Sequence, residues 1–155
     1  VCGKEWEVNL DCCMREMGTD TWRPIKEFSD AMFRDEEVVP MEAGINHAAL
    51  KRETVYLSSK IVTRFYEPQY PRLKEAGKGR LFLTDAGLIF INSRDNSIKI
   101  FRFEDIRGRS TEQNTFFQIV LDDNIARFEM KQESCYKWEL YYDFLRKKRG
   151  FREEE

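Results

Sequence analysis

The groups best suited to metal chemistry are few in this chain. They comprise four cysteines and one histidine: Cys2, Cys12, Cys13, Cys135 and His47. Structural zinc sites usually take four such ligands at short, regular spacings, and this set is irregular. The residues 1–4 nevertheless resemble the second half of a zinc knuckle whose first cysteine would lie upstream. We predict free thiols, no metal and no cofactor, with that upstream zinc site as the open alternative.

Sequence motifs for catalysis are absent. The chain has no serine in a Gly-x-Ser-x-Gly setting and no glycine-rich phosphate loop. The neighbouring carboxylates Asp122 and Asp123 are interpreted as a turn, because aspartate tolerates tight backbone geometry. His47 is interpreted as a surface or helix-capping group. These patterns predict a protein that is not an enzyme.

The charge is unevenly distributed along the chain. The net charge is −2, but residues 51–110 carry 13 basic and 7 acidic groups, whereas residues 1–50 carry 5 and 11. The basic middle predicts either a face for phosphates or acidic partners, or simple pairing with the acidic N-terminal block. Nucleic acid is not expected as a partner, because the aromatic residues are spaced for burial rather than for stacking along a basic strand.

Length and composition limit the architecture. A chain of 155 residues, 41% hydrophobic, with a mean hydropathy of −0.64, predicts one soluble domain with an extension and no membrane span. The sequence shows no signal-peptide pattern. We expect an N-terminal extension over 1–50, a domain over 51–150 and a charged tail over 151–155, all within a larger intracellular protein.

Period-two apolar runs predict about seven antiparallel strands. Three lie within 79–106, separated by the turn signals 84–87 and 93–96. Residues 54–57 and 60–66 form a pair of strands or one bent strand, and 115–121 and 126–131 flank the turn at Asp122. Pro68, Pro71, Gly77 and Gly79 are interpreted as the longest loop of the domain.

Three helical segments are expected. Ser134 and Gly150 bound a helix over 135–149 whose apolar face comprises Cys135, Trp138, Tyr141, Tyr142 and Leu145. A second helix, over 21–35, is predicted to pack Trp22, Ile25, Phe28 and Met32 onto the sheet. A short helical turn is expected within 43–52.

The segment 53–148 resembles the pleckstrin-homology (PH) superfold, and within it the GRAM-type branch. The residues that carry the resemblance are 79–84, 88–90, 100–106 and Trp138. The expected fold is therefore mainly β: a seven-stranded antiparallel PH-like barrel or sandwich capped by a C-terminal α-helix, with a helical N-terminal extension. The core positions expected to define it are Leu81, Leu83, Ile89, Ile119, Trp138, Tyr142 and Leu145.

This resemblance implies a non-enzymatic adaptor module that recruits a larger protein to an anionic membrane surface or to a protein partner. Relatives that bind inositol phosphates use basic residues around the first strands. The candidates here are Lys60, Arg64, Arg72, Lys74, Lys78, Arg80, Arg94, Lys99 and Arg102. The alternative is a structural or oligomerisation domain that binds protein only, including a second copy of itself. The expected location is cytoplasmic, with peripheral membrane attachment where lipid is the ligand.

Overall fold

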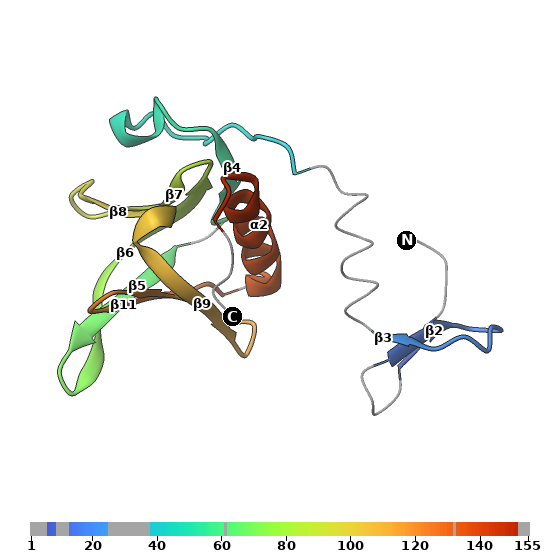
Figure 1. Ribbon diagram of the computed structural model, residues 1–155. Coiled ribbons are helices and arrows are strands. Elements are labelled where there is room, and N and C mark those ends of the chain that lie inside the picture. The colour runs from blue at the N-terminus through green and yellow to red at the C-terminus, as the bar shows by residue number, and fades with distance from the viewer. Residues whose placement is uncertain (1–5, 9–12, 25–37, 61, 132, 152–155) are drawn as a thin grey trace. The chain divides into compact units, whose positions relative to one another are not determined.

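The chain divides into two compact units, Val1–Glu37 and Val38–Glu155. The computed structural model describes residues 6–8, 13–24, 38–60, 62–131 and 133–151 (Figure 1). Each unit has its own sheet, so the two are described separately.

The N-terminal unit contains a three-stranded antiparallel sheet. Its strands are β1 (Trp6–Val8), β2 (Cys13–Glu16) and β3 (Arg23–Pro24), in the order β1-β2-β3. An ion pair of 2.6 Å between Arg15 and Glu7 links the first two strands, and the Arg15 guanidinium lies 4.7 Å from the centre of the Trp22 ring. The predicted helix over 21–35 is not observed at residues 21–24, of which 21–22 are irregular and 23–24 form β3. Its remainder lies outside the described residues.

The second unit is built on one antiparallel sheet of eight strands. The strands are β4 (Val55–Ser58), β5 (Thr63–Gln69), β6 (Arg72–Thr84), β7 (Gly87–Asn92), β8 (Ile98–Arg102), β9 (Ile106–Glu112), β10 (Phe116–Leu121) and β11 (Ile125–Glu129). They run in the order β8-β7-β6-β5-β11-β10-β9, with β4 paired to β6. The expectation of a mainly β, antiparallel domain is confirmed.

The two turn signals of the basic middle region form the expected hairpins. Between β6 and β7, the Thr84 hydroxyl donates to Gly87 O at 3.1 Å and accepts from Ala86 N at 3.2 Å. Gly87 has φ +146°, and a Cβ there would lie 2.1 Å from Phe101 O. Glycine is therefore required at this turn.

The longest loop was placed wrongly by the sequence pattern. Residues 63–79 instead form a two-stranded ribbon of β5 and the first part of β6, with a turn at Tyr70 and Pro71 and a register shift between Phe65 and Tyr66 (Figure 1). Proline is tolerated at position 68 because β5 pairs with β11 only as far as Tyr66, which leaves the outer part of the ribbon without a second neighbour.

One strand of the eight-stranded sheet was not anticipated. The third apolar run of the basic middle region ends at β8, and a 3-10 turn, η2 (Phe103–Asp105), separates it from β9. Strand β9 has the sequence IRGRSTE, which lacks the apolar alternation of a half-buried strand. It forms because β10 pairs with it along its length.

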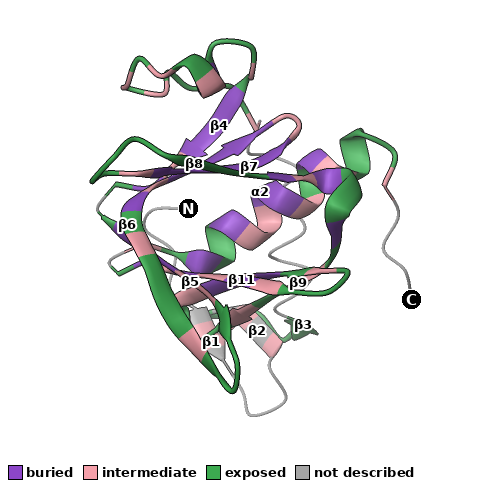
Figure 2. Cartoon of the chain, turned by 90° about the vertical axis from the view of Figure 1, so that its left-hand side faces the viewer, coloured by how far each residue is buried: buried purple, intermediate pink, exposed green. Residues whose placement is uncertain are grey.

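The C-terminal helix α2 (Cys135–Lys148) forms as expected and covers the sheet. Figure 2 shows it between β4 and β7 on one side and β5, β11 and β9 on the other. The Ser134 side chain caps its first turn by accepting from Lys137 N, and Gly150 has φ +86°. All five residues of its predicted apolar face are buried, including Trp138 at 3% exposure.

Aromatic rings fill the space between the sheet and the helix. Phe65, Phe90, Phe101 and Phe128 contact one another with ring centres 5.2 to 6.1 Å apart. Phe103 and Phe117 contact Tyr142 of α2 at 5.3 and 5.9 Å. Burial raises the pKa of Tyr142 to about 12. The seven positions assigned to the core from the sequence are all buried.

A second apolar cluster lies on the other face of β6 and β7. Phe82, Ile89 and Ile91 are buried there with Val55 of β4 and Leu50. Residues 38–52, here called the strap, supply the cover through Leu50 and the partly buried Ala43, Ile45 and Ala49. The strap contains the expected helical turn, η1 (Ala48–Leu50). The strap thus covers this face of β6 and β7. The predicted packing of residues 21–35 onto the sheet stays a prediction, since residues 25–35 lie outside the described residues.

Candidate functional site

The nine candidate cations do not form one cluster. Five of them bind groups within the domain: Arg64, Lys78, Arg80, Lys99 and Arg102. Arg102 lies 2.6 Å from Glu53, and Lys99 lies 3.5 Å from Glu67. Four of the nine candidates, Arg64, Lys78, Lys99 and Arg102, thus pair with carboxylates of the same domain. Pairing of the basic middle with the acidic N-terminal block stays a prediction, because seven of the eleven carboxylates of residues 1–50 lie outside the described residues.

Arg80 has a structural role. Its guanidinium donates to Ser58 Oγ at 2.6 Å and to Ser59 O at 3.4 Å, and it lies over the Phe82 ring at 5.3 Å. These contacts hold the connection between β4 and β5 against β6. A ligand could bind the Arg80 guanidinium only by replacing these hydrogen bonds, which would loosen the β4–β5 connection.

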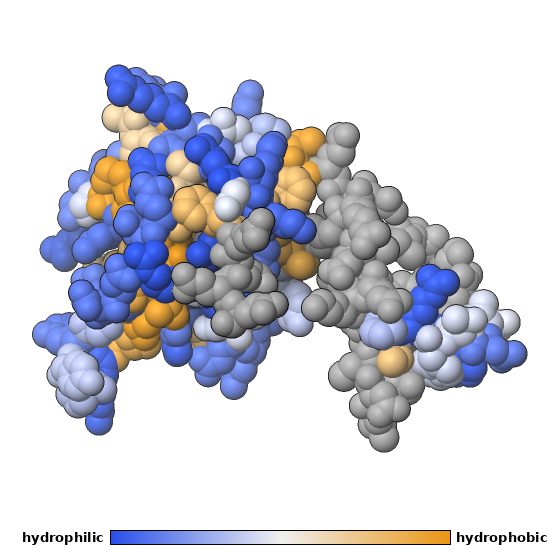
Figure 3. Space-filling view, in the orientation of Figure 1, coloured by the Kyte–Doolittle hydropathy of each residue, from blue (hydrophilic) through white to orange (hydrophobic). Residues whose placement is uncertain are grey.

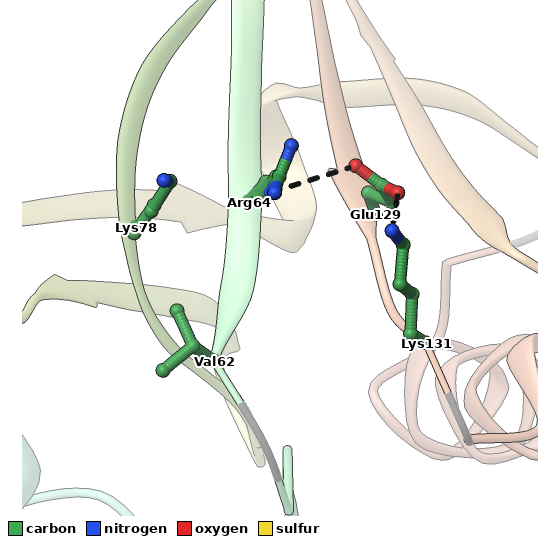
Figure 4. A pocket seen from close by; sticks show the side chains of 5 residues that line it. All are labelled: Val62, Arg64, Lys78, Glu129 and Lys131. Atoms are coloured by element: carbon green, nitrogen blue, oxygen red, sulfur yellow. Dashed lines mark ion pairs between the residues drawn. The ribbon is translucent and has the colours of Figure 1, made fainter.

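Arg64 and Lys78 border a hollow of about 260 Å³ on the sheet surface, together with Val62, Glu129 and Lys131 (Figure 4). Arg64 lies 3.7 Å from Glu75 and 4.0 Å from Glu129, and Lys131 lies 3.3 Å from Glu129. The sequence pattern missed Glu129 and Lys131. Their nearness to Arg64 depends on the pairing of β11 with β5, and the chain order alone does not give that register.

The charged side chains around this hollow pair with one another. A hydrogen bond with Tyr66, reinforced by Glu129 and Glu75, raises the pKa of the Arg64 guanidinium. Burial by itself would raise the pKa of Glu129. Hydrogen bonds from Tyr66 and Lys131, together with the positive charges of Lys131 and Arg64, outweigh burial and lower this pKa. The Tyr66 hydroxyl donates to Glu129 Oε2 at 3.0 Å. The hollow therefore offers little unneutralised positive charge to an anion.

The exposed tip of the β5–β6 ribbon is chemically different. Tyr70 is 97% exposed there, next to Pro71. Arg72 and Lys74 follow on β6, both exposed and without an ion pair to any described residue. Lys74 pairs in register with Glu67, whose carboxylate also meets Lys99. The end of the projecting ribbon thus carries an exposed aromatic ring and two unpaired cations, and Lys99 of β8 reaches the ribbon at Glu67.

Two further candidate cations lie elsewhere. Arg94 is exposed in the turn between β7 and β8. Lys60 lies between β4 and β5, where its backbone N–H donates to Glu133 Oε1 at 2.8 Å. Glu133 immediately precedes α2, so this bond ties the β4–β5 connection to the helix. Neither residue extends the cluster at the ribbon tip.

His47 caps the helical turn of the strap, as its interpretation from the sequence anticipated. Its Nδ1 accepts from Ala49 N at 3.1 Å, and its Nε2 lies 3.3 Å from Asn96 O in the β7–β8 turn. Among the described residues, no group of three or more metal-binding side chains is present. Cys135 is a free thiol, whereas Cys2 and Cys12 lie outside the described residues. Burial raises the pKa of the Cys135 thiol to about 11, which makes it a poor nucleophile.

Comparisons with known proteins assign no family. No family model matches the chain, and no curated protein matches it. One solved structure, the C-terminal domain of an unknown protein from Leishmania infantum, resembles it with a TM-score of 0.42 and 14% identity. That alignment covers 78% of this chain and 97% of the other. A similarity at this level carries no argument about function. No helix in the described part of the chain is long and apolar enough to span a bilayer.

Proposed function

We propose that the second unit is a non-enzymatic PH-like recruitment module, of the GRAM type, that docks a larger intracellular protein onto an anionic membrane surface. The observation that carries the proposal is the ribbon tip, where the exposed Tyr70 ring lies beside Arg72 and Lys74. Aromatic side chains favour the membrane–water interface, and each nearby cation contributes about 1 kcal/mol toward anionic lipid.

The strand order supports the PH-like part of this proposal. The path β8-β7-β6-β5-β11-β10-β9 is two antiparallel meanders joined through β5 and β11, and a C-terminal helix lies against it. A sheet that curls in this way needs an amphipathic helix at its open side, since the rings facing inward would otherwise meet water. Trp138 and Tyr142 fill that position.

The contacts also narrow the lipid-binding residues to a subset of the nine candidates. Arg64, Lys78, Arg80 and Arg102 already bind groups in the domain, and Lys60 and Arg94 lie away from the ribbon. This leaves Arg72 and Lys74 on the ribbon, with Lys99 of β8 next to Glu67 of β5. The Lys99–Glu67 pair is exposed, and such pairs stabilise a fold by less than about 1 kcal/mol. Lys99 is therefore available to a headgroup phosphate at small cost to the fold.

The test is vesicle co-sedimentation with neutral phosphatidylcholine vesicles and with vesicles containing phosphatidylserine and phosphoinositide. The wild-type chain is expected to pellet with the anionic vesicles only. Lys74→Glu is expected to weaken binding roughly fivefold, since it removes about 1 kcal/mol of attraction. Tyr70→Ala is expected to weaken it further.

Two matched variants control for net charge and aromatic content. Lys131→Glu makes the same charge change at the other end of the sheet, and Tyr136→Ala removes an exposed tyrosine of α2. Both are expected to pellet like the wild type. Equal recovery with neutral and anionic vesicles, or equal losses in the control variants, would refute membrane recruitment through the ribbon tip.

The alternative function, protein binding without a lipid ligand, is favoured by a different observation. Strand β8 lies at one end of the strand order and carries two half-exposed isoleucines.

A further inference from the structure

Tyr70 differs from the other five tyrosines of the chain in its surroundings. Its side chain is 97% exposed at the turn of the β5–β6 ribbon. Tyr136 is 61% exposed but belongs to α2. The remaining four are held in the fold, either buried or hydrogen-bonded: Tyr56, Tyr66, Tyr141 and Tyr142. Tyr70 is thus the tyrosine whose hydroxyl is most open to a modifying enzyme.

The backbone that carries Tyr70 has few constraints. Strand β5 pairs with β11 only over Arg64 to Tyr66, so residues 67–74 are held by pairing between the two strands of the ribbon. Figure 1 shows this end projecting from the sheet, and in Figure 3 it stands out at the lower left with hydrophilic residues on its surface. A two-stranded ribbon is only marginally stable by itself, so its end can open locally and enter the substrate groove of an enzyme.

The charge at this end of the ribbon is small enough for one modification to cancel it. Residues 67–74, together with the lysine of β8 that reaches them, carry three cations and one carboxylate: Arg72, Lys74, Lys99 and Glu67. The next carboxylate along β6, Glu75, is bound by Arg64 and Lys78. The net charge of the end is therefore +2. A phosphoryl group on tyrosine carries about −1.5 to −2 at pH 7, so one phosphate on Tyr70 removes most or all of this charge.

A phosphate on Tyr70 would also lie next to a group that the proposed function assigns to lipid. Arg72 follows Tyr70 by two positions and has no ion pair to any described residue. Hydrogen bonds between guanidinium and phosphate are strong and often bidentate, so an attached phosphate competes with a lipid phosphate for Arg72. A phenol ring that carries a dianion also loses its preference for the membrane–water interface. Both effects weaken binding to an anionic surface.

We propose that Tyr70 is a phosphorylation site whose modification releases the second unit from anionic membranes. A tyrosine kinase transfers the γ-phosphoryl group of ATP to the Tyr70 hydroxyl oxygen. The O–H bond breaks, its proton passes to the catalytic base of the kinase, and ADP leaves. A phosphatase reverses the change by hydrolysing the phosphate ester. The inference rests on the proposed function, because it concerns the regulation of the same ribbon tip.

The first experiment tests whether Tyr70 accepts the phosphoryl group, without any membrane. The full chain is incubated with ATP, Mg²⁺ and the catalytic domain of a tyrosine kinase of broad specificity, and mass spectrometry of peptides identifies the sites. Tyr70 is expected to react at least tenfold faster than Tyr136, and Tyr70→Phe is expected to remove the main product. Equal rates at the two positions, or no reaction at Tyr70 while a control peptide in the same tube is phosphorylated, would exclude the site.

The second experiment measures binding to vesicles that contain phosphatidylserine and phosphoinositide. Full chain with phosphotyrosine incorporated at position 70 during translation is compared with the unmodified chain, and phosphotyrosine at position 136 is the matched control. The modification at position 70 is expected to weaken binding at least tenfold, and the one at position 136 to leave it unchanged. Phosphatase treatment should restore binding. Tyr70→Phe keeps the ring and should bind like the wild type before and after kinase treatment, which separates the added charge from loss of the ring.

The outcomes distinguish failure of the switch from failure of the proposed function. Binding that survives phosphorylation at position 70, or that is lost equally on phosphorylation at position 136, would overturn the switch and leave membrane recruitment standing. No binding of the unmodified chain to anionic vesicles would overturn both, whatever the kinase does. Amide resonances outside residues 67–74 should not move on phosphorylation. Changes throughout the domain would instead assign the loss of binding to unfolding and overturn the switch.

Discussion

The Glu133 side chain links the β4–β5 connection to α2, yet its buried charge lowers the free energy of unfolding. Its Oε1 accepts from Lys60 N at 2.8 Å, but its Oε2 is buried and has no hydrogen-bond partner among the described residues. Burial raises the pKa of this carboxyl, and the Lys60 amide and the charges of Lys60, Arg80 and Lys137 only partly offset the increase. A buried carboxylate whose pKa is raised in the folded protein reduces the free energy of unfolding when it is ionised.

The pH dependence follows from the direction of this shift. The folded state holds the Glu133 proton to a higher pH than the unfolded state does. Glu133 therefore lowers the free energy of unfolding as the pH rises above the ordinary carboxyl pKa of 4.5. Glu133→Gln keeps an acceptor for Lys60 N and removes the charge. We expect it to be more stable than the wild type at pH 7, with the difference shrinking toward pH 4.

Urea unfolding at several pH values measures this difference. Glu104→Gln is the control, because Glu104 is exposed in η2, and its curve should run parallel to that of the wild type. A Glu133→Gln variant less stable than the wild type at pH 7 would show that the neighbouring cations outweigh the burial cost.

Strand β6 is the element that most of the sheet depends on, because it pairs with β4, β5 and β7. Its residues Leu81 to Thr84 are buried on both faces, by α2 and the core rings on one side and by the strap on the other. A strand enclosed in this way tolerates changes in side-chain volume poorly.

Gly79 of β6 is the position where this constraint is tightest. A Cβ there would lie 1.9 Å from Ile91 O in the paired strand, so alanine would force β6 and β7 apart. We expect Gly79→Ala to lower the free energy of unfolding by about 3 kcal/mol. Thermal and urea unfolding measure the loss.

Gly108 of β9 provides the comparison. A Cβ there meets only Val120 side-chain atoms at 3.9 Å or more, so alanine fits, and we expect Gly108→Ala to stabilise by about 0.5 kcal/mol. Equal stabilities of the two variants would contradict the close approach of β6 and β7.

The whole chain consists of two units, and the apolar clusters described above all lie in the second. The aromatic core, the strap cluster and α2 fall within residues 38–151. The strap supplies one face of that core, so the folding unit has to include it.

We therefore expect a fragment of residues 38–155 to fold without the N-terminal unit. Its thermal unfolding should be cooperative, and its amide spectrum should overlay that of the same residues in the full chain. A fragment of residues 53–155, which lacks the strap, should be markedly less stable, because Phe82, Ile89 and Ile91 lose their cover. Equal stability of the two fragments would mean that the strap contributes little.

Local patterns were sufficient to predict the elements that depend on neighbouring residues. The apolar spacing of α2, its Ser134 cap and Gly150 end, and the turns at 84–87 and 93–96 all involve contacts within a few positions of one another. Such short-range rules act in any tertiary context, so these predictions were confirmed.

Long-range pairing decided the remainder. The polar strand β9 exists because β10 lies beside it, and the prolines and glycines of 68–79 lie in a ribbon because β5 and β6 pair through them. The same holds for the surfaces. Of the nine candidate cations, Arg64, Lys78 and Arg102 are paired only because strand pairing brings Glu53, Glu75 and Glu129 to them. Register is a property of two strands together, and neither strand's sequence contains it.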